Sequence, residues 1–232
     1  MASIILVMGL LLWYEADTDP TGILKGESKD SFVVVIDAGH GGFDPGKVGV
    51  DGTLEKDINL SISLILKELL ENENMTVFMT RTTDAAVGTT DGNVTKQEDM
   101  RARVTLINES NADIAVSIHQ NSFTKESSKG AQVFYHTQSE EGEKLALLIQ
   151  EKIKMSVGDD NYRQAKSNDS YYMLKKTTCP IVIAECGFLS NYAESALLKQ
   201  EAYQRKIAEG IKNGILAYYE LQKEKAYTSN EM

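Results

Sequence analysis

The chain has 232 residues, of which 42% are hydrophobic and 25% are charged, as in an ordinary globular protein. This length allows one large domain or two small ones. The formal net charge of −10 argues against nucleic acid as a partner, because phosphates would repel the protein, and the sequence has no polybasic patch for anionic lipids.

The first predicted element is an apolar segment over residues 4–14, which ends in Trp13 and Tyr14. At 11 residues it is too short for a bilayer-spanning helix, which needs about 20 residues. Its length is typical of a signal-peptide core, although it lacks a basic start and a clear cleavage motif, and the aromatic pair is typical of an interfacial anchor. We predict that residues 1–14 are an export signal or membrane anchor and residues 15–31 a polar linker. The alternative is a strand or helix packed on the domain, but no period of 2 or 3.6 residues supports it.

From residue 32 onward, strand patterns alternate with helix patterns. The predicted strands cover residues 32–37, 76–80, 113–119, 131–135 and 181–185. The predicted helices cover residues 55–73, 97–110, 139–157, 191–201 and 203–222. This alternation predicts an α/β fold, with a mostly parallel twisted sheet and helices on both faces, in a single domain over residues 32–222. A polar tail over residues 223–232 follows that domain.

Side chains that can bind metals or transfer protons follow three of these strands. His40, His119 and Glu185 each stand at or just past the end of a predicted strand, and the chain has only three histidines in all. The carboxyl ends of parallel strands are where α/β proteins bind ligands. The glycine-rich turn around His40 is also compatible with a phosphate site, but no Lys-Ser/Thr pair follows it, as a nucleotide-binding P-loop would require.

Glu55 stands at the start of a predicted helix and falls on its apolar stripe, three residues before Ile58 and seven before Ile62. A buried carboxylate without a partner is costly, so this position favours a nearby cation. The alternative is a first-turn glutamate that faces water and interacts with the helix dipole. His40, Glu55 and His119 together form a plausible His/Glu/His zinc site.

Glu185 ends a strand that is otherwise apolar, which indicates a central strand buried on both faces. Burial should raise the pKa of this carboxyl unless a charge holds it. Glu185 is therefore a candidate general base, and it is not necessarily a metal ligand.

Residues 36–42, Glu55, residues 117–121 and residues 185–191 resemble, in this order, the zinc-dependent N-acetylmuramoyl-L-alanine amidases. The resemblance extends over about residues 32–220. Four motifs in the same order make it specific, and it covers nearly all of the predicted globular part.

This resemblance implies a zinc ion held by His40, Glu55 and His119, with Glu185 as the catalytic acid–base residue. It also implies peptidoglycan as the substrate, cleaved at the amide between the lactyl group of N-acetylmuramic acid and L-alanine. The short form with an apolar N-terminus is most similar to the germination-specific members in spore-forming bacteria, which strip peptides from the spore cortex before muramic δ-lactam is made. The implied location is outside the cytoplasmic membrane, in the cell wall or cortex, either secreted or anchored through residues 4–14.

Two further residues are candidates for substrate contact. Asn121 shares a strand face with His119 and is placed to orient that ring or touch substrate. Arg163 resembles a family position near the substrate, where it would bind a stem-peptide carboxylate; the alternative is a solvated loop charge. Gln120 differs from the small residue that relatives often carry, and strand alternation directs it away from the metal.

Two other functions remain open from the sequence. One is a zinc peptidase that cuts within the stem peptide, and the other is a non-catalytic protein that binds the cell wall. The retention of all four site residues argues against the second. An activating protein partner that controls metal loading also remains open.

Overall fold

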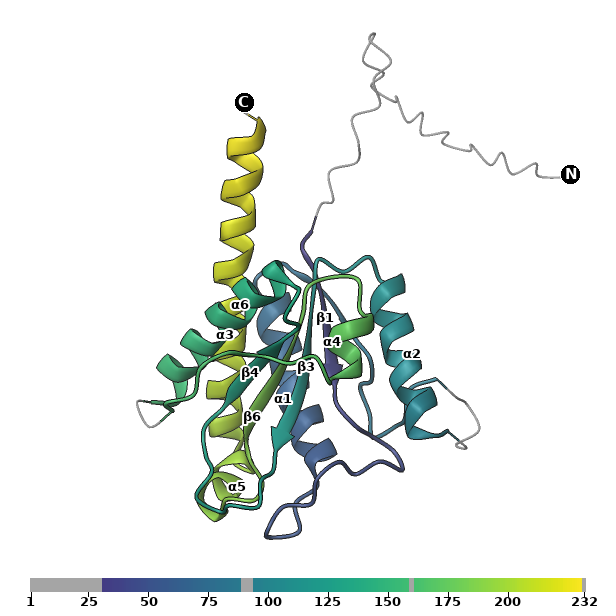
Figure 1. Ribbon diagram of the computed structural model, residues 1–232, viewed down its shortest axis with the longest axis vertical. Coiled ribbons are helices and arrows are strands. Elements are labelled where there is room, and N and C mark those ends of the chain that lie inside the picture. Colours follow the sequence, from purple (N-terminus) through teal and green to yellow (C-terminus); the bar gives the residue numbers. More distant parts are fainter. Residues whose placement is uncertain (1–30, 89–93, 159–160, 231–232) are drawn as a thin grey trace, which may run out of the picture. The chain divides into compact units, whose positions relative to one another are not determined.

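A computed structural model describes residues 31–88, 94–158 and 161–230. The predicted export segment, residues 1–14, and the linker up to residue 30 lie outside the described residues. The described chain forms a six-stranded sheet with helices on both faces (Figure 1). This confirms the predicted fold class.

The strand order across the sheet is β2-β1-β3-β6-β4-β5. The strands are β1 (Val33–Ala38), β2 (Thr76–Met79), β3 (Ile114–Asn121), β4 (Gln132–Tyr135), β5 (Lys166–Ser167) and β6 (Ile181–Phe188). All neighbouring pairs are parallel except β4 and β6. Strand β4 runs antiparallel because no helix or strand between β3 and β4 returns the chain to the opposite edge of the sheet. Its first residue, Gln132, therefore lies beside Glu185.

Helices α1, α3 and α6 pack on one face of the sheet, and α2 and α4 pack on the other. The helices are α1 (Glu55–Glu71), α2 (Lys96–Glu109), α3 (Glu140–Val157), α4 (Tyr172–Lys176), α5 (Tyr192–Leu198) and α6 (Glu201–Asn230). Among the helices in these described stretches, none combines the length and the apolar character needed to cross a membrane.

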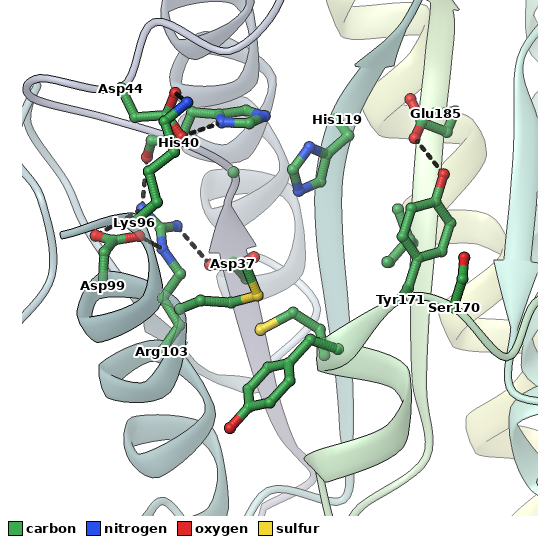
Figure 2. Close-up of a pocket in the computed structure, with 15 residues that line it drawn as sticks. Asp37, His40, Asp44, Lys96, Asp99, Arg103, His119, Ser170, Tyr171 and Glu185 are labelled. Atoms are coloured by element: carbon green, nitrogen blue, oxygen red, sulfur yellow. Dashed lines mark hydrogen bonds and ion pairs between the residues drawn. The ribbon is translucent and has the colours of Figure 1, made fainter.

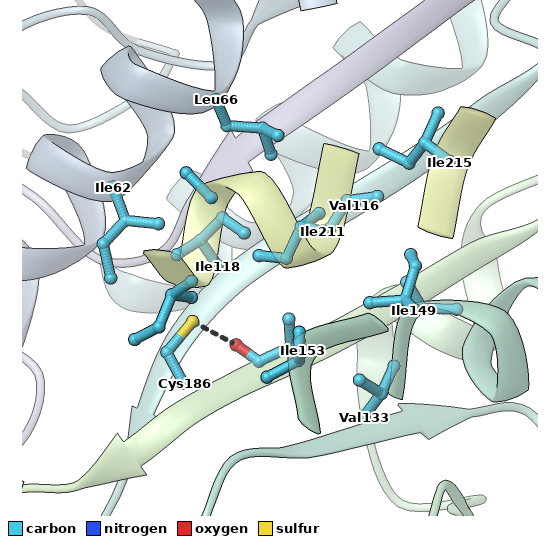
Figure 3. Packing of buried hydrophobic residues seen from close by; sticks show 14 of the residues in the cluster. Ile62, Leu66, Val116, Ile118, Val133, Ile149, Ile153, Cys186, Ile211 and Ile215 are labelled. Carbon is cyan, nitrogen blue, oxygen red and sulfur yellow. Dashed lines mark hydrogen bonds between the residues drawn. The ribbon is translucent and has the colours of Figure 1, made fainter. Parts of the chain in front are cut away.

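The main core lies between the sheet and α1, α3 and α6 (Figure 3). Val116 and Ile118 from β3 contribute to it, together with Ile149 from α3 and Ile211 from α6. Each fully buried side chain of this size stabilises the fold by about 1.5–3 kcal/mol. Alternate residues of β3 point to the opposite face, and His119 belongs to that second set.

The structure differs from the predicted elements in two unpredicted short elements and in the ends of several others. Strand β5 and helix α4 are not predicted, because two and five residues are too short for a periodic pattern to show. Strand β6 extends three residues further, since Phe188 still pairs with Asn121. Helix α6 continues to Asn230, so the predicted end at residue 222 is wrong. Its last turns lack an apolar stripe, yet Lys, Glu and Ala favour the helix and Lys225 pairs with Glu141.

Candidate metal centre and catalytic carboxylate

The turn after β1 presents His40 at the carboxyl edge of the sheet (Figure 2). His40 has a φ of 62°, a left-handed conformation that costs a non-glycine residue about 1–3 kcal/mol. Its Nδ1 lies 2.7 Å from Asp44 Oδ2, and Asp44 Oδ1 accepts a hydrogen bond from Lys96 Nζ at 2.6 Å. Burial opposes ionisation of Asp44, but Lys96 and His40 outweigh it and lower its pKa to about 2. In the tautomer in which Nδ1 carries the proton, Nδ1 donates a hydrogen bond to the ionised Asp44, and the Nε2 lone pair is left for a metal ion.

Glu55 is the first residue of α1, and its side chain is only 2% exposed. Its Oε1 lies 3.0 Å from His119 Nδ1, and its Oε2 lies 3.3 Å from His40 Nε2. The main-chain amides of Lys47 and Gln120 also donate to this carboxylate, at 2.8 and 3.0 Å. Burial opposes ionisation, but His119 and His40 hold the pKa of Glu55 well below its usual range. The inward orientation predicted from the helix stripe is confirmed.

Two glycines let the main chain pass directly against this cluster. Gly46 has a φ of 70°, and a Cβ there would lie 2.6 Å from Glu55 Oε2 and 2.7 Å from His40 Cδ2. A Cβ on Gly39 would overlap the His119 ring. Any larger residue at either position would therefore displace one of the three side chains.

The donor atoms of His40, Glu55 and His119 all lie within 4.8 Å of one another, a spacing that can hold a metal ion. Ligands about 2.1 Å from a tetrahedral ion are about 3.4 Å apart. The observed separations between the glutamate oxygens and the histidine nitrogens are 3.0 and 3.3 Å. Two imidazoles and one carboxylate are a known donor set of catalytic zinc sites, where a fourth position stays open. The residues therefore fit a zinc ion.

A cavity of about 390 Å³ opens beside this cluster, between α2 and α4, and Glu185 lines it together with both histidines (Figure 2). Glu185 Oε1 accepts a hydrogen bond from Tyr171 Oη at 3.3 Å. Within the described part of the chain, Glu185 Oε2 is buried and has no hydrogen-bond partner. Burial raises the pKa of Glu185, although His119 opposes the rise. A carboxyl in this state suits proton transfer inside the cavity.

The two predicted substrate residues do not line this cavity. Asn121 is half-buried at the end of β3, and its Oδ1 accepts a hydrogen bond from the Ser122 amide. Arg163 Nε donates to the Lys129 carbonyl at 2.7 Å, and its Nη1 donates to Gln132 Oε1 at 3.1 Å. Its guanidinium carbon also lies 4.5 Å from the centre of the Phe188 ring.

Gln120 lies away from the cavity, as strand alternation predicts. Its side chain is buried, and its Nε2 donates to Asn59 Oδ1 at 3.1 Å. Asn59 Nδ2 in turn donates to the Gly39 carbonyl at 3.0 Å. The polar side chain at this position thus supports the segment just before His40.

Asp37 lies at the end of β1 and lines the cavity. It pairs with Arg103 Nη1 at 2.8 Å and accepts hydrogen bonds from Ser117 Oγ at 2.5 Å and Thr80 Oγ1 at 2.7 Å. Burial opposes ionisation, but Arg103 and Ser117 outweigh it and lower the pKa of Asp37 to about 2. Both oxygens are committed to this network, so Asp37 supports the site.

The sequence does not single out Asp44, Tyr171, Arg81 or Arg103. For Asp44 the available signal is a carboxylate four residues after a strand-end histidine, since ligand histidines commonly bond a carboxylate through the second ring nitrogen. The other three carry no local signal, because tertiary contacts alone bring them to the site.

Fold and site together define an α/β protein with a candidate mononuclear metal centre at the carboxyl edge of a mostly parallel sheet. Residues 34–217 match the family described as N-acetylmuramoyl-L-alanine amidase. The chain therefore belongs to the N-acetylmuramoyl-L-alanine amidase family, as the four sequence motifs predict.

Individual relatives agree with this assignment. The chain is 38% identical over 190 residues to the germination-specific N-acetylmuramoyl-L-alanine amidase of Bacillus subtilis, covering 81% of this chain and 79% of that protein. The solved CwlD amidase of Clostridioides difficile, in complex with the GerS lipoprotein, matches with 41% identity and a TM-score of 0.79. That match covers 82% of this chain and 100% of the CwlD chain. The catalytic domain of CwlV from Bacillus (Paenibacillus) polymyxa matches with 30% identity, a TM-score of 0.72, and coverage of 82% and 98%.

Proposed function

We propose that this protein is a zinc-dependent amidase that removes stem peptides from the glycan of the bacterial spore cortex. Amidase activity on peptidoglycan follows from membership of the family. The proposal adds zinc as the metal, the roles of individual residues and the cortex as the target.

One observation carries the proposal. The donor atoms of His40, Glu55 and His119 cluster within 4.8 Å at one wall of a cavity, and a second wall holds the buried Glu185 carboxyl. Its Oε2 is buried and has no hydrogen-bond partner among the described residues, so no other protein group competes for a proton on this oxygen. A metal-binding cluster and a separate proton-transfer group are the two components that metal-assisted amide hydrolysis needs.

In the proposed site, His40, Glu55 and His119 hold the zinc. When bound, the ion polarises the substrate carbonyl and makes a water molecule more acidic. Glu185 takes a proton from the attacking water, and the water oxygen forms a bond to the amide carbon. Glu185 then delivers the proton to the amide nitrogen as the carbon–nitrogen bond breaks. The products are the lactyl carboxylate of the sugar and the free amino group of L-alanine.

Tyr171 keeps Glu185 turned toward the cavity in this scheme, since its hydroxyl donates to Oε1 at 3.3 Å. The ring of Tyr171 is itself braced edge-on against Phe134, with 5.7 Å between ring centres. In this scheme Tyr171 therefore fixes Oε1 of Glu185, and Oε2 is the oxygen that accepts and donates the proton.

Arg163 is the proposed carboxylate-binding residue of the site. Its hydrogen-bond partner Gln132 pairs in register with Glu185, so the two side chains lie on the same face of adjacent strands. The contact with Phe188 fixes the guanidinium plane, and a planar guanidinium suits bidentate recognition of a stem-peptide carboxylate. Asn121, at the end of β3 beside β6, is the proposed second contact to substrate.

The cortex assignment is supported by the relatives, two of which are a germination-specific amidase and the CwlD amidase. The same likeness supports export across the cytoplasmic membrane, through a signal or anchor in residues 1–14. The CwlD structure is a complex with the GerS lipoprotein, which supports a protein partner for this chain.

Product analysis tests this function. The purified protein is incubated with zinc and peptidoglycan from spores or vegetative cells, with Glu185→Gln as the matched control. Amidase activity produces intact stem peptides with a free L-alanine amino group, in larger amounts from cortex. Peptides cut internally would instead identify a stem peptidase, and release of nothing by a zinc-loaded protein would indicate a wall-binding protein.

A further inference from the structure

Two buried arginines bind the main chain next to His40. Arg81 Nε donates to the Ala38 carbonyl at 2.8 Å, and its Nη2 donates to the Gly39 carbonyl at 3.1 Å. Arg103 Nη1 donates to the Ala38 carbonyl at 2.7 Å, and its Nη2 donates to the His40 carbonyl at 2.5 Å. Every carbonyl from residue 38 to residue 40 thus accepts a hydrogen bond from a guanidinium.

Arg81 also reaches the start of α1. Its Nη2 donates to the Lys56 carbonyl at 2.8 Å, and its Nη1 donates to the Thr83 carbonyl at 3.0 Å. Lys56 directly follows Glu55 in the chain. One guanidinium therefore connects the segment that carries His40 to the segment that carries Glu55.

Arg103 is oriented by two carboxylates from different elements. Its Nε donates to Asp99 Oδ2 at 2.6 Å, one turn earlier on α2, and its Nη1 pairs with Asp37 Oδ1 at 2.8 Å on β1. Asp99 is held in turn by the Val87 amide at 2.6 Å. These carboxylates therefore fix the plane of the Arg103 guanidinium, which also donates to the His40 carbonyl.

The main chain of residues 38–40 needs the guanidinium donors of Arg81 and Arg103 for two reasons. His40 adopts a left-handed backbone with a φ of 62°, which persists only where surrounding groups hold it. The carbonyls past the end of β1 also lie in a buried region, where an unpaired carbonyl is costly. A guanidinium carries five donors in a rigid fork, whereas a lysine ammonium is a single point of attachment.

We propose that Arg81 and Arg103 are positioning residues that preset the distance between His40 and Glu55 for metal binding. This inference rests on the proposed function, because it takes His40 and Glu55 to be zinc ligands. Neither arginine contacts the metal. Both act through the main chain before the ion arrives: Arg81 joins the two ligand-bearing segments, and Arg103 fixes the segment that carries His40.

The affinity for zinc tests the positioning role of the two arginines without any measurement of catalysis. We would prepare Arg81→Lys and the matched control Arg205→Lys, which makes the same change on α6 at a side chain that is 39% exposed. Zinc dissociation constants come from competition with a chromophoric chelator. The absorption spectrum of the Co²⁺-substituted protein reports the coordination geometry, and thermal unfolding of the metal-free protein reports folding.

We expect Arg81→Lys to fold and to bind zinc about 10- to 100-fold more weakly than wild type, with a shifted Co²⁺ spectrum, and Arg205→Lys to match wild type. A wild-type zinc affinity and Co²⁺ spectrum in Arg81→Lys would overturn the inference, even if that variant melts earlier. Should Arg81→Lys fail to fold, Arg103→Lys decides by the same criterion. Wild-type protein that binds no zinc would instead refute the proposed function, so the two failures are distinguishable.

Discussion

Replacing Gly46 with alanine tests whether the metal cluster depends on the close approach of the main chain. Gly46 has a φ of 70°, and an added Cβ would lie 2.6 Å from Glu55 Oε2 and 2.7 Å from His40 Cδ2. Gly52, in the same loop, offers a matched control. Its φ is 84°, but an added Cβ would meet nothing within 4 Å.

Both substitutions impose a left-handed conformation on alanine, which costs about 1–2 kcal/mol of stability. At Gly46 the new methyl must also displace the Glu55 carboxylate or the His40 ring by about 0.8 Å to reach ordinary van der Waals separation. A displacement of that size in a metal ligand lowers affinity strongly. We expect Gly46→Ala to bind zinc at least about 10-fold more weakly, and Gly52→Ala to bind it like wild type.

The assay combines chelator competition for zinc with urea unfolding of the metal-free variants. Gly46→Ala should lose at least as much stability as Gly52→Ala, because both carry the backbone strain and only Gly46→Ala adds the overlap, and it alone should lose zinc affinity. Equal dissociation constants at equal loss of stability would refute the reasoning, since the steric overlap at Gly46 would then have no effect on the cluster.

Three further predictions follow from the site. Glu185→Gln should keep its zinc content and lose roughly 100-fold or more in rate, whereas His119→Ala should lose the metal; loss of zinc from Glu185→Gln would make Glu185 a ligand instead. Arg163→Ala should lower kcat/KM on peptide-bearing glycan by about 10- to 150-fold at unchanged zinc content, and an unaltered kcat/KM would remove this residue from the site. The pKa of Asp37 falls from 3.8 to about 2 on folding, so its pairing with Arg103 stabilises the fold above pH 3.8 and is lost as the pH falls toward 2. Over this range, urea unfolding of the metal-free protein should show a loss about 2 kcal/mol larger than that of Asp37→Asn; identical pH dependence in both proteins would contradict it.

The amino-acid sequence alone is sufficient to predict the fold class and the proximity of the central side chains. Strand periodicity places His119 and Glu185 at the carboxyl ends of their strands, and helical periodicity turns Glu55 inward. These predictions succeed because each depends on a local repeat, and because parallel strands bring their carboxyl ends to one edge of the sheet.

Short elements and helix ends are less predictable. Helix α4 and strand β5 are too brief to show a period, yet α4 forms one wall of the cavity. The last turns of α6 form without an apolar stripe, through intrinsic propensity and the contact of Lys225 with Glu141.

The supporting contacts were decided by the tertiary structure alone. Arg81 and Arg103 bind main-chain carbonyls, which every residue possesses, so no pattern of side chains in the sequence identifies their targets. Tyr171 reaches Glu185 only because α4 packs over β6. A side chain's direction from its own strand or helix is a local property that sequence periodicity records, whereas its partner from a distant element is set by how the elements pack.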